Sequence, residues 1–193
     1  MTEILKAKDR REREGWYDKF APPNAKGIDI GGGCKPQTQL HPDNENWTVW
    51  DMCKGDGDAT FMKGVPNNHY DVVHASHILE HVKNPKRALF NWYRILKPGG
   101  HLIVLVPHRD LYEKKLAPPS RWNHDHKTFW VPHRPEEDAP PTTKGLLDEI
   151  LGALPRARVI QLRILDEGFK SAGDYEHSLG EYSIEAIVRK VLS

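Results

Sequence analysis

The sequence predicts an α/β protein with three layers and a mostly parallel sheet. Short apolar runs alternate with segments of helical periodicity along most of the chain, as in strands joined by crossover helices. The run at residues 102–106, Leu-Ile-Val-Leu-Val, is unbroken and rich in β-branched residues, which is typical of a parallel strand covered on both faces. A glycine triplet at 31–33 directly follows the first apolar run and is typical of the entrance to a nucleotide-type site.

The remaining elements follow from local signals. Strands are expected at residues 26–30, 47–50, 70–75, 102–106, 158–165 and 182–192. A charged amphipathic helix is expected at residues 2–20, and another helix at 144–154. A third helix begins after Asn84 and Pro85, because asparagine is a favoured N-cap and proline is favoured at the first helical position. It is expected to stop at Pro98-Gly99-Gly100.

We expect a single domain over residues 1–193, since domains commonly have about 100–200 residues. Residues 1–20 are predicted to form a surface helix, with a lid over the site as the alternative. Residues 108–143 are predicted to form an insertion, because they are rich in Pro, His, Trp and charge and have little periodicity. Loops of this length are usually functional or disordered, and this one follows a strand at the edge where open α/β sheets bind ligands.

Composition limits the possible classes of function. The formal net charge of +1 gives no bulk electrostatic case for nucleic acid or an anionic membrane. Cys34 and Cys53 are the two cysteines, and they do not form a CxxC pair, so we expect no disulfide and a reducing, cytoplasmic setting. The chain shows neither an apolar run long enough to span a membrane nor an apolar signal core near residue 1.

The glycine triplet and a later aspartate suggest an adenosine-containing cofactor. Gly31, Gly32 and Gly33 allow a tight turn and a close approach of backbone N–H groups to a ligand. Asp51 ends the second predicted strand about 20 residues later, where a carboxylate can accept hydrogen bonds from ribose hydroxyls. The alternatives are that the glycines form only a turn and that Asp51 caps one. A nicotinamide dehydrogenase is disfavoured, because no third glycine of the dinucleotide pattern opens a helix.

The segment Tyr70–Pro107 carries a family resemblance. Its sequence is YDVVHASHILEHVKNPKRALFNWYRILKPGGHLIVLVP, with an Asp-Val-Val strand, a Leu-Glu-His segment and an Arg-x-Leu-Lys-Pro-Gly-Gly turn. Together with Gly27–Gly33 it closely resembles the class I, Rossmann-like S-adenosylmethionine-dependent methyltransferases, in particular their small type-11-like members. The resemblance covers about residues 26–107. Lys35 departs from it by replacing a glycine of the cofactor loop, and the 18 residues between Asp51 and Tyr70 leave little room for a third strand and its helix.

The resemblance implies S-adenosylmethionine as cofactor and a seven-stranded sheet of order 3-2-1-4-5-7-6 with one antiparallel strand, shortened around strands 1–3. In this family the glycine loop contacts the methionine part, and an acidic residue after the second strand holds the ribose. The implied cofactor-binding residues are Asp29, Gly31, Gly32, Gly33, Asp51, Met52, Asp58, Ala59, His74, Ala75 and Ser76. With its shortened strands, this chain is similar to small methyltransferases that are often tied to glycan assembly.

His77, Glu80 and His81 form a possible metal site. On a helix they would occupy positions i, i+3 and i+4 and point the same way. Two imidazoles and a carboxylate on one face can bind a divalent metal. The favoured interpretation is that Glu80 and His81 brace the helix against the sheet, because family members without a metal resemble this segment equally. The predicted site therefore includes no metal.

The catalytic candidates lie in the insertion. Methyl transfer to a hydroxyl benefits from a base whose pKa is near the working pH, and histidine meets this demand best. We predict His108 and His126 as the bases, with Asp125 or Asp110 orienting an imidazole. Trp122 and Trp130 are further candidates, for stacking on a sugar or base, although aromatic residues can also simply pack a surface loop.

The sequence therefore predicts methyl transfer to oxygen or nitrogen of a small polar acceptor, with a sugar or sugar nucleotide as one class. One alternative is a nucleic-acid methyltransferase, which would use Lys and Arg between residues 83 and 134. Another is a non-catalytic cofactor-binding subunit whose insertion docks a partner protein, since a fold can persist without its chemistry.

Overall fold

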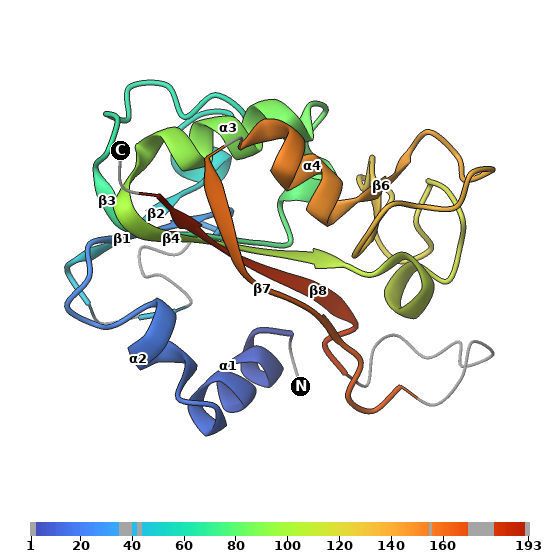
Figure 1. The fold of residues 1–193 in the computed structure, drawn as a ribbon, viewed down its shortest axis with the longest axis horizontal. Coiled ribbons are helices and arrows are strands. Elements are labelled where there is room, and N and C mark those ends of the chain that lie inside the picture. Colours follow the sequence, from blue (N-terminus) through green and yellow to red (C-terminus); the bar gives the residue numbers. More distant parts are fainter. Residues whose placement is uncertain (1–2, 35–39, 42–43, 155, 170–179, 192–193) are drawn as a thin grey trace.

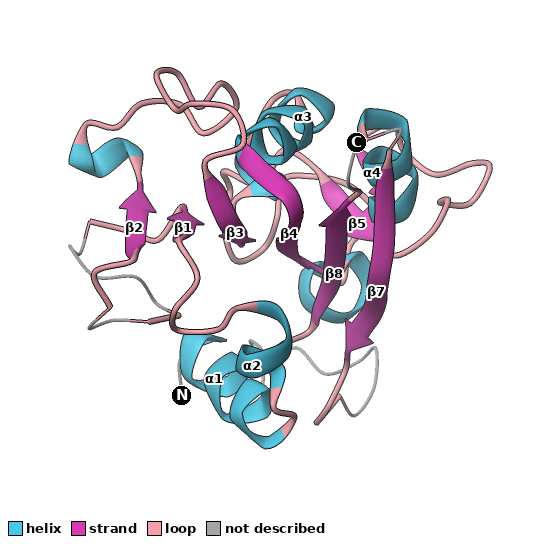
Figure 2. Cartoon of the chain, turned by 60° about the vertical axis from the view of Figure 1, so that its left-hand side comes forward, coloured by secondary structure: helices cyan, strands magenta, loops and turns pink. Residues whose placement is uncertain are grey.

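A six-stranded sheet forms the middle layer of the computed structural model, which describes residues 3–34, 40–41, 44–154, 156–169 and 180–191. The strand order is β2-β1-β3-β4-β8-β7 (Figures 1 and 2). The strands are β1 (Gly27–Ile30), β2 (Trp47–Trp50), β3 (Tyr70–Ser76), β4 (Leu96–Pro107), β7 (Ala157–Leu165) and β8 (Ser183–Lys190). β1 to β4 pair in parallel, whereas β8 is antiparallel to both of its neighbours, β4 and β7. The predicted Rossmann-like α/β class is confirmed.

The described part of the sheet has one strand fewer than the seven expected. Residues 51–69, between β2 and β3, form a short 3-10 turn, η1 (Met52–Lys54), followed by further turns. Gly55, Gly57 and Gly64 in this segment all have positive φ, which a regular strand or helix does not accommodate. A parallel crossover also needs a dozen or more residues of its own. The segment is therefore too short and too rich in glycine turns for a third strand with its helix.

One face of the sheet is covered by α3 (Pro85–Ile95) and α4 (Leu146–Ala153). The predicted N-cap is confirmed, because the Asn84 side chain accepts a hydrogen bond from the Arg87 N–H at 3.1 Å. The helix ends earlier than predicted, at Ile95 and not at the Pro-Gly-Gly turn. The reason is that Leu96 already pairs with Tyr70 of β3 and so starts the next strand.

The opposite face is covered by two helices, α1 (Glu3–Arg13) and α2 (Trp16–Phe20) (Figure 1). The single helix predicted over residues 2–20 is wrong, because Gly15 adopts the left-handed conformation with φ of 59° and breaks it. Trp16 is buried against the sheet. The two helices are thus part of the packed structure and not a solvated appendage.

Ion pairs hold α1 to β8. Arg10 donates hydrogen bonds to Glu181 at 2.6 Å and to Glu185 at 3.2 Å, and Arg163 of β7 reaches the same Glu185 at 2.9 Å. Glu185 is fully buried. Burial opposes its ionisation, but Arg10, Arg11 and Arg163 outweigh this and hold the pKa of Glu185 below its ordinary value.

No described helix has the length and apolarity needed to cross a bilayer.

The insertion is ordered and lies at one end of the sheet (Figure 1). It contains a helical turn, η3 (Arg109–Glu113), and a small parallel sheet of β5 (Phe129–Val131) and β6 (Thr143–Gly145). Trp130 is fully buried in the main hydrophobic core. The predicted stacking role for Trp130 is therefore wrong, because its ring faces the core and not a ligand.

Candidate active site

Two adjoining cavities lie at the carboxyl ends of the parallel strands, the edge where open α/β sheets bind ligands. The larger has a volume of about 710 Å³ and the smaller about 310 Å³. Gly31, which follows β1, and His81 line both cavities. A ligand that fills the larger cavity therefore reaches the smaller one past these two residues.

The larger cavity gathers many of the predicted cofactor residues. Its walls include Gly31, Asp51, Met52, Asp58 and Ala59. It combines the strand-terminal carboxylate of Asp51 with apolar side chains such as Met52 and Phe61, and charged side chains also line it, a composition that suits a nucleoside.

Two lining residues of this cavity escaped the sequence analysis. Phe61 is partly exposed and stacks under the Arg87 guanidinium, whose central carbon lies 4.6 Å from the ring centroid. Ile78 closes another wall beside the glycine loop. Phe61 lies outside the segments that carry the family resemblance. Ile78 lies within one but is an ordinary apolar residue there, so sequence pattern offered no signal for either.

The glycine loop has the backbone geometry that requires glycine. Gly31 and Gly33 have φ values of 76° and 85°, and a Cβ on Gly31 would lie 3.0 Å from the Cβ of Ile78. The Gly33 N–H donates to Asp51 Oδ2 at 2.9 Å, and Asp51 Oδ1 accepts from the Cys53 N–H at 3.0 Å. Asp51 therefore caps a turn, while each carboxylate oxygen keeps a further lone pair for a ribose hydroxyl. The departure at Lys35 lies outside the described residues.

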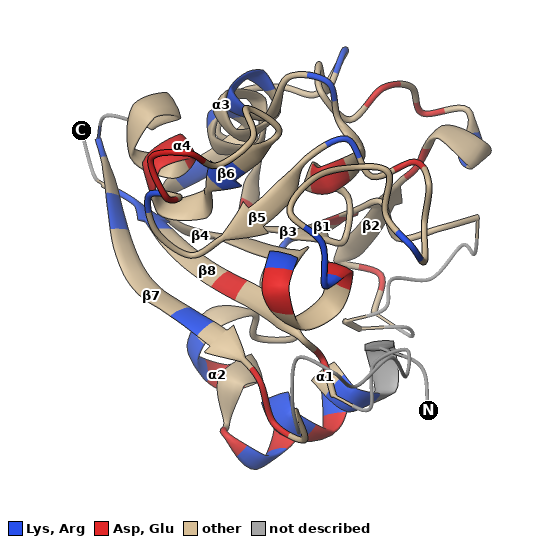
Figure 3. Cartoon of the chain, turned by 90° about the vertical axis from the view of Figure 1, so that its right-hand side faces the viewer, with Lys and Arg blue, Asp and Glu red and all other residues tan. Residues whose placement is uncertain are grey.

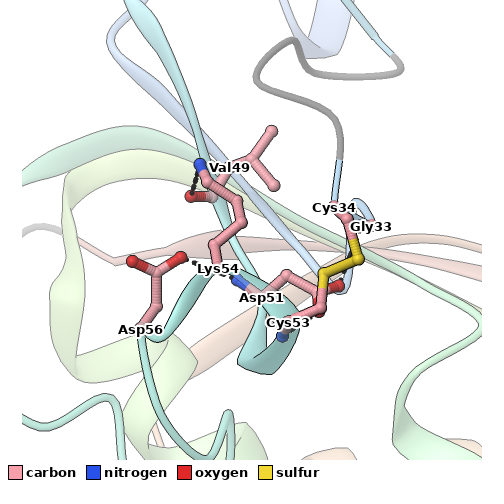
Figure 4. Close-up of a disulfide and its surroundings, with 7 residues drawn as sticks. All are labelled: Gly33, Cys34, Val49, Asp51, Cys53, Lys54 and Asp56. Carbon is pink, nitrogen blue, oxygen red and sulfur yellow. Dashed lines mark hydrogen bonds between the residues drawn. A yellow bond between two sulfur atoms is a disulfide. The ribbon is translucent and has the colours of Figure 1, made fainter.

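A disulfide joins Cys34 to Cys53, with 5.4 Å between their Cα atoms (Figure 4). The prediction of no disulfide is therefore wrong. Cys34 follows the glycine loop after β1 and Cys53 follows Asp51 after β2, and these neighbouring parallel strands end at the same edge of the sheet. The spacing of the two cysteines in sequence did not reveal this proximity. The bond ties the glycine loop to the turn that carries Asp51.

The strand residues predicted to contact the cofactor divide into two groups. His74 and Ser76 line the smaller cavity, whereas Ala75 is fully buried in the core and lines neither cavity. His74 Nδ1 lies 2.8 Å from Asp29 Oδ1, and both side chains are buried. Burial lowers the pKa of His74 more than Asp29 raises it, so the imidazole is neutral at pH 7.

Asp29 and Gly32 lie behind the loop and not on a cavity wall. Asp29 is occupied by His74, as the 2.8 Å contact shows. Gly32 is buried, and a Cβ built on it would lie 3.1 Å from Asp29 Oδ2. Asp29 and Gly32, which were predicted to contact the cofactor, therefore support the glycine loop from behind in this structure.

The smaller cavity is built from segments that are far apart in sequence. α1 and α2 contribute one wall, the segment after β3 a second, and the insertion a third. The polar side chains on these walls are Lys8, Arg11, Tyr17, His74, Ser76, His77, Glu80, His81, Tyr112, Asn123, His126 and Glu181. The insertion thus lines a cavity at the carboxyl ends of the parallel strands.

Glu80 lies at the centre of a group of imidazoles. The predicted helical face is wrong, because His77 has a φ of 53° and only a 3-10 turn, η2 (Leu79–His81), follows. The side chains nevertheless converge: Glu80 Oε1 lies 3.6 Å from His77 Nδ1, 3.9 Å from His81 Nε2 and 3.9 Å from His126 Nε2. Burial opposes ionisation of Glu80, but these imidazoles hold its pKa below the ordinary value.

His126 is held by a different carboxylate from the one predicted. Its Nδ1 lies 2.5 Å from Glu113 Oε1, and both side chains are buried. Asp125 orients His81 instead, with its Oδ2 3.0 Å from His81 Nδ1. Glu113 escaped the sequence analysis, because its pairing with His126 depends on how the insertion folds between them.

His108 and Asp110 lie away from this group. His108 is buried and does not line the smaller cavity, and its Nδ1 accepts a hydrogen bond from the Asp110 N–H at 3.0 Å. The Asp110 carboxylate pairs with Arg109 at 2.7 Å. This pair therefore caps the η3 turn, and the structure gives His108 a structural contact in place of the predicted cavity position.

Comparisons with known proteins agree with this geometry. Residues 6–137 match the family described as "Methyltransferase domain". The ubiquinone/menaquinone biosynthesis C-methyltransferase UbiE of Escherichia coli O1:K1 / APEC is 29% identical over 119 residues, which are 60% of this chain and 45% of that protein. The chain spans less than half the length of the curated relatives that it matches.

Solved structures show the same fold. The N-methyltransferase NodS from Bradyrhizobium japonicum WM9 is similar, with a TM-score of 0.54 and 17% identity over 95% of this chain and 97% of that one. An S-adenosylmethionine dependent methyltransferase from Mesorhizobium loti has a TM-score of 0.53 and 11% identity over 91% of this chain and 96% of that one.

Proposed function

This chain belongs to the methyltransferase-domain family, and we propose that it transfers a methyl group to an oxygen or nitrogen of a small polar acceptor. Family membership confirms the predicted class, the S-adenosylmethionine-dependent methyltransferases, and with it the cofactor. The nature of the acceptor is the proposal.

The observation that carries the proposal is the pair of adjoining cavities. The larger one, at about 710 Å³, has the residues predicted to hold the adenosyl part of the cofactor. The smaller one, at about 310 Å³, is polar and has the size of a small-molecule site. Gly31 and His81 stand where the cavities meet, which is where a methyl group would pass from donor to acceptor.

The chemistry needs alignment more than activation, because the sulfonium is already a strong electrophile. A lone pair of the acceptor oxygen or nitrogen forms the bond to the methyl carbon. The carbon–sulfur bond breaks, its electron pair stays on sulfur, and S-adenosylhomocysteine results. The acceptor's proton passes to His126, whose Nδ1 is held by Glu113 while its Nε2 faces the cavity group.

The surface favours a small molecule over a nucleic acid as acceptor. Lys and Arg are interspersed with Asp and Glu over α1 and α2, which wall the smaller cavity (Figure 3). A nucleic-acid site would instead concentrate positive charge along one face. Tyr112, Asn123 and Lys8 offer hydrogen bonds suited to a hydroxyl-rich acceptor such as a sugar or sugar nucleotide.

Cofactor binding is the first test. We expect calorimetry to show micromolar binding of S-adenosylmethionine and S-adenosylhomocysteine, and much weaker binding by Asp51→Asn, which keeps one acceptor oxygen for the turn. A panel of sugar nucleotides, amines and RNA, supplied with a labelled methyl donor, then identifies the acceptor. Label in the small-molecule fraction supports the proposal, whereas label only in RNA, or no cofactor binding, overturns it.

A further inference from the structure

We propose that Glu80, His81 and His126 bind a divalent transition-metal ion of the Zn²⁺ type in the wall of the smaller cavity. Occupancy of this site stands independently, while its role in activating the acceptor rests on the proposed function.

The donor atoms already converge. One carboxylate oxygen of Glu80 and one nitrogen from each of His81 and His126 all lie within 4.8 Å of one another. Both Nε2 atoms lie 3.9 Å from Glu80 Oε1, too far for a hydrogen bond. Ligand atoms about 2.0–2.2 Å from a tetrahedral zinc ion are separated by roughly 3.3–3.5 Å, so binding requires only small movements.

The buried carboxylate of Glu80 has imidazoles at 3.6–3.9 Å but no hydrogen bond to the described part of the chain. Its side chain is fully buried, and within the described residues neither of its oxygens has a hydrogen-bond partner. An ionised carboxylate in such a place is strongly unfavourable unless a cation or several donors compensate it. A bound dication would supply this compensation.

A carboxylate holds the far nitrogen of each histidine, in the orientation that a metal site requires. His81 Nδ1 lies 3.0 Å from Asp125, and His126 Nδ1 lies 2.5 Å from Glu113. A carboxylate accepts hydrogen bonds, so each Nδ1 donates to its carboxylate, and the Nε2 of each ring lies on the side toward Glu80. Carboxylates that hold the far nitrogen of an imidazole are the usual outer support of metal-binding histidines. A single general base would explain one such histidine–carboxylate pair. It would not explain two pairs that converge on a buried carboxylate without a hydrogen bond to any described residue.

The donor set and its position indicate the kind of ion. Two imidazoles and one carboxylate favour Zn²⁺, Fe²⁺, Co²⁺ or Ni²⁺ over Mg²⁺ and Ca²⁺. Three protein ligands leave an open position, as in catalytic zinc sites. All three residues line the smaller cavity, so the open position would meet the acceptor's oxygen or nitrogen and lower its pKa. With the ion bound, His126 acts as a ligand, and the acceptor's proton leaves to water.

Metal titration of the full chain tests the site. Protein stripped with a chelator is titrated with Zn²⁺ by calorimetry, and bound ion is counted by elemental analysis. We expect about one ion per chain in the wild type, and loss of that binding in Glu80→Gln and His126→Gln. Asp125→Asn should weaken binding by about 10- to 100-fold, since it removes only the outer support. His124→Gln is the matched control, because this exposed histidine lies on the same insertion.

The outcomes separate the site from the proposed function. Equal ion content in the wild type and His126→Gln, or equal loss in His124→Gln, overturns the site. Zn²⁺ should also raise the unfolding midpoint of the wild type and not of His126→Gln, a readout that needs no acceptor. If the ion binds but methyl transfer survives its removal, the role in activation is overturned. Failure to bind S-adenosylmethionine would overturn the proposed function while the ion titration still reports on the site.

Discussion

Single side chains around the smaller cavity act in pairs, and Glu113 with His126 is a buried pair of this kind. Replacing Glu113 by Gln removes the carboxylate that orients the imidazole at 2.5 Å. We expect the rate of methyl transfer to fall by about 10- to 100-fold, the usual cost of losing such support. The affinity for S-adenosylmethionine should stay the same, because the larger cavity is untouched. Glu137→Gln, an exposed change on the same insertion, should leave both quantities unchanged, and an equal loss there would contradict the role of Glu113.

The sequence analysis predicted His126 as a candidate base but did not predict Glu113 as its partner. A histidine in a long insertion after a core strand can be predicted as a candidate base from its side-chain chemistry and its position in the chain. Its partner was predicted from adjacency, as Asp125, whereas the structure supplies Glu113 across a fold of the insertion. Glu80 was predicted to lie with His77 and His81, and it does, although through a 3-10 turn instead of a helix.

Gly31 makes a different kind of contribution, through its backbone. Gly31→Ala should destabilise the protein by about 1–2 kcal/mol, because its φ of 76° is unfavourable for any residue with a Cβ. It should also weaken S-adenosylmethionine binding, since the new Cβ would lie 3.0 Å from Ile78 and displace a cavity wall. Gly168→Ala is the control: its φ is 84°, but nothing lies within 4 Å of its Cβ position. Equal cofactor affinity in both variants would contradict this assignment.

Among the elements, the pair α1 and α2 depends on contacts that sequence pattern does not reveal. The alternating charges near the start of the chain predict a solvated helix. In the structure, however, Arg10 is buried against Glu185, which is 175 positions away in the sequence. Charge periodicity describes a helix face and contains no information about a partner so distant. The result is that the predicted surface helix forms a wall of the smaller cavity.

Glu185→Gln tests this attachment. It would leave the guanidinium groups of Arg10 and Arg163 without their shared carboxylate, and we expect a loss of about 3–5 kcal/mol in the free energy of unfolding. Denaturant unfolding measures this loss. Glu167→Gln breaks only the exposed pair with Arg13 and should cost less than about 1 kcal/mol. Similar stability of the two variants would show that α1 is held by apolar packing alone.

The disulfide links the glycine loop to the turn that carries Asp51, and the effect of its removal on stability can be calculated. Cys34 and Cys53 are 19 positions apart, so the bond restricts a loop of the unfolded chain by an amount worth about 3 kcal/mol. We expect Cys53→Ser to lower the free energy of unfolding by roughly this amount under oxidising conditions. A reductant should bring the wild type to the same value and leave the variant unchanged. If the reductant affects neither protein, the bond does not form in solution.

At the scale of the whole molecule, sequence pattern predicted the strands of the main sheet better than the small second sheet of the insertion. β1, β3 and β4 were predictable because buried parallel strands are continuous apolar runs. The small sheet of β5 and β6 was not, because three-residue strands are too short to show a period. The missing strand between β2 and β3 could be anticipated from the 18-residue spacing, since the chain there is too short for a full crossover.

The stability of the whole molecule should depend on pH through its buried neutral histidines. Burial lowers the pKa of His74 despite Asp29, and lowers that of His108 despite Asp110. As the pH falls through about 6.5, the unfolded chain therefore takes up protons that the folded chain does not. The free energy of unfolding should decrease between pH 7 and 5, by up to about 1.4 kcal/mol per pH unit for each histidine.

His108→Asn isolates one of these contributions. Asparagine keeps an oxygen to accept the Asp110 N–H but does not titrate, so the variant should lose less stability than the wild type as the pH falls. Urea unfolding at several pH values between 5 and 8 measures the difference. His124→Asn, at an exposed position, should follow the wild-type curve. A His108→Asn curve parallel to the wild type would show that His108 protonates as readily in the folded chain as in the unfolded one.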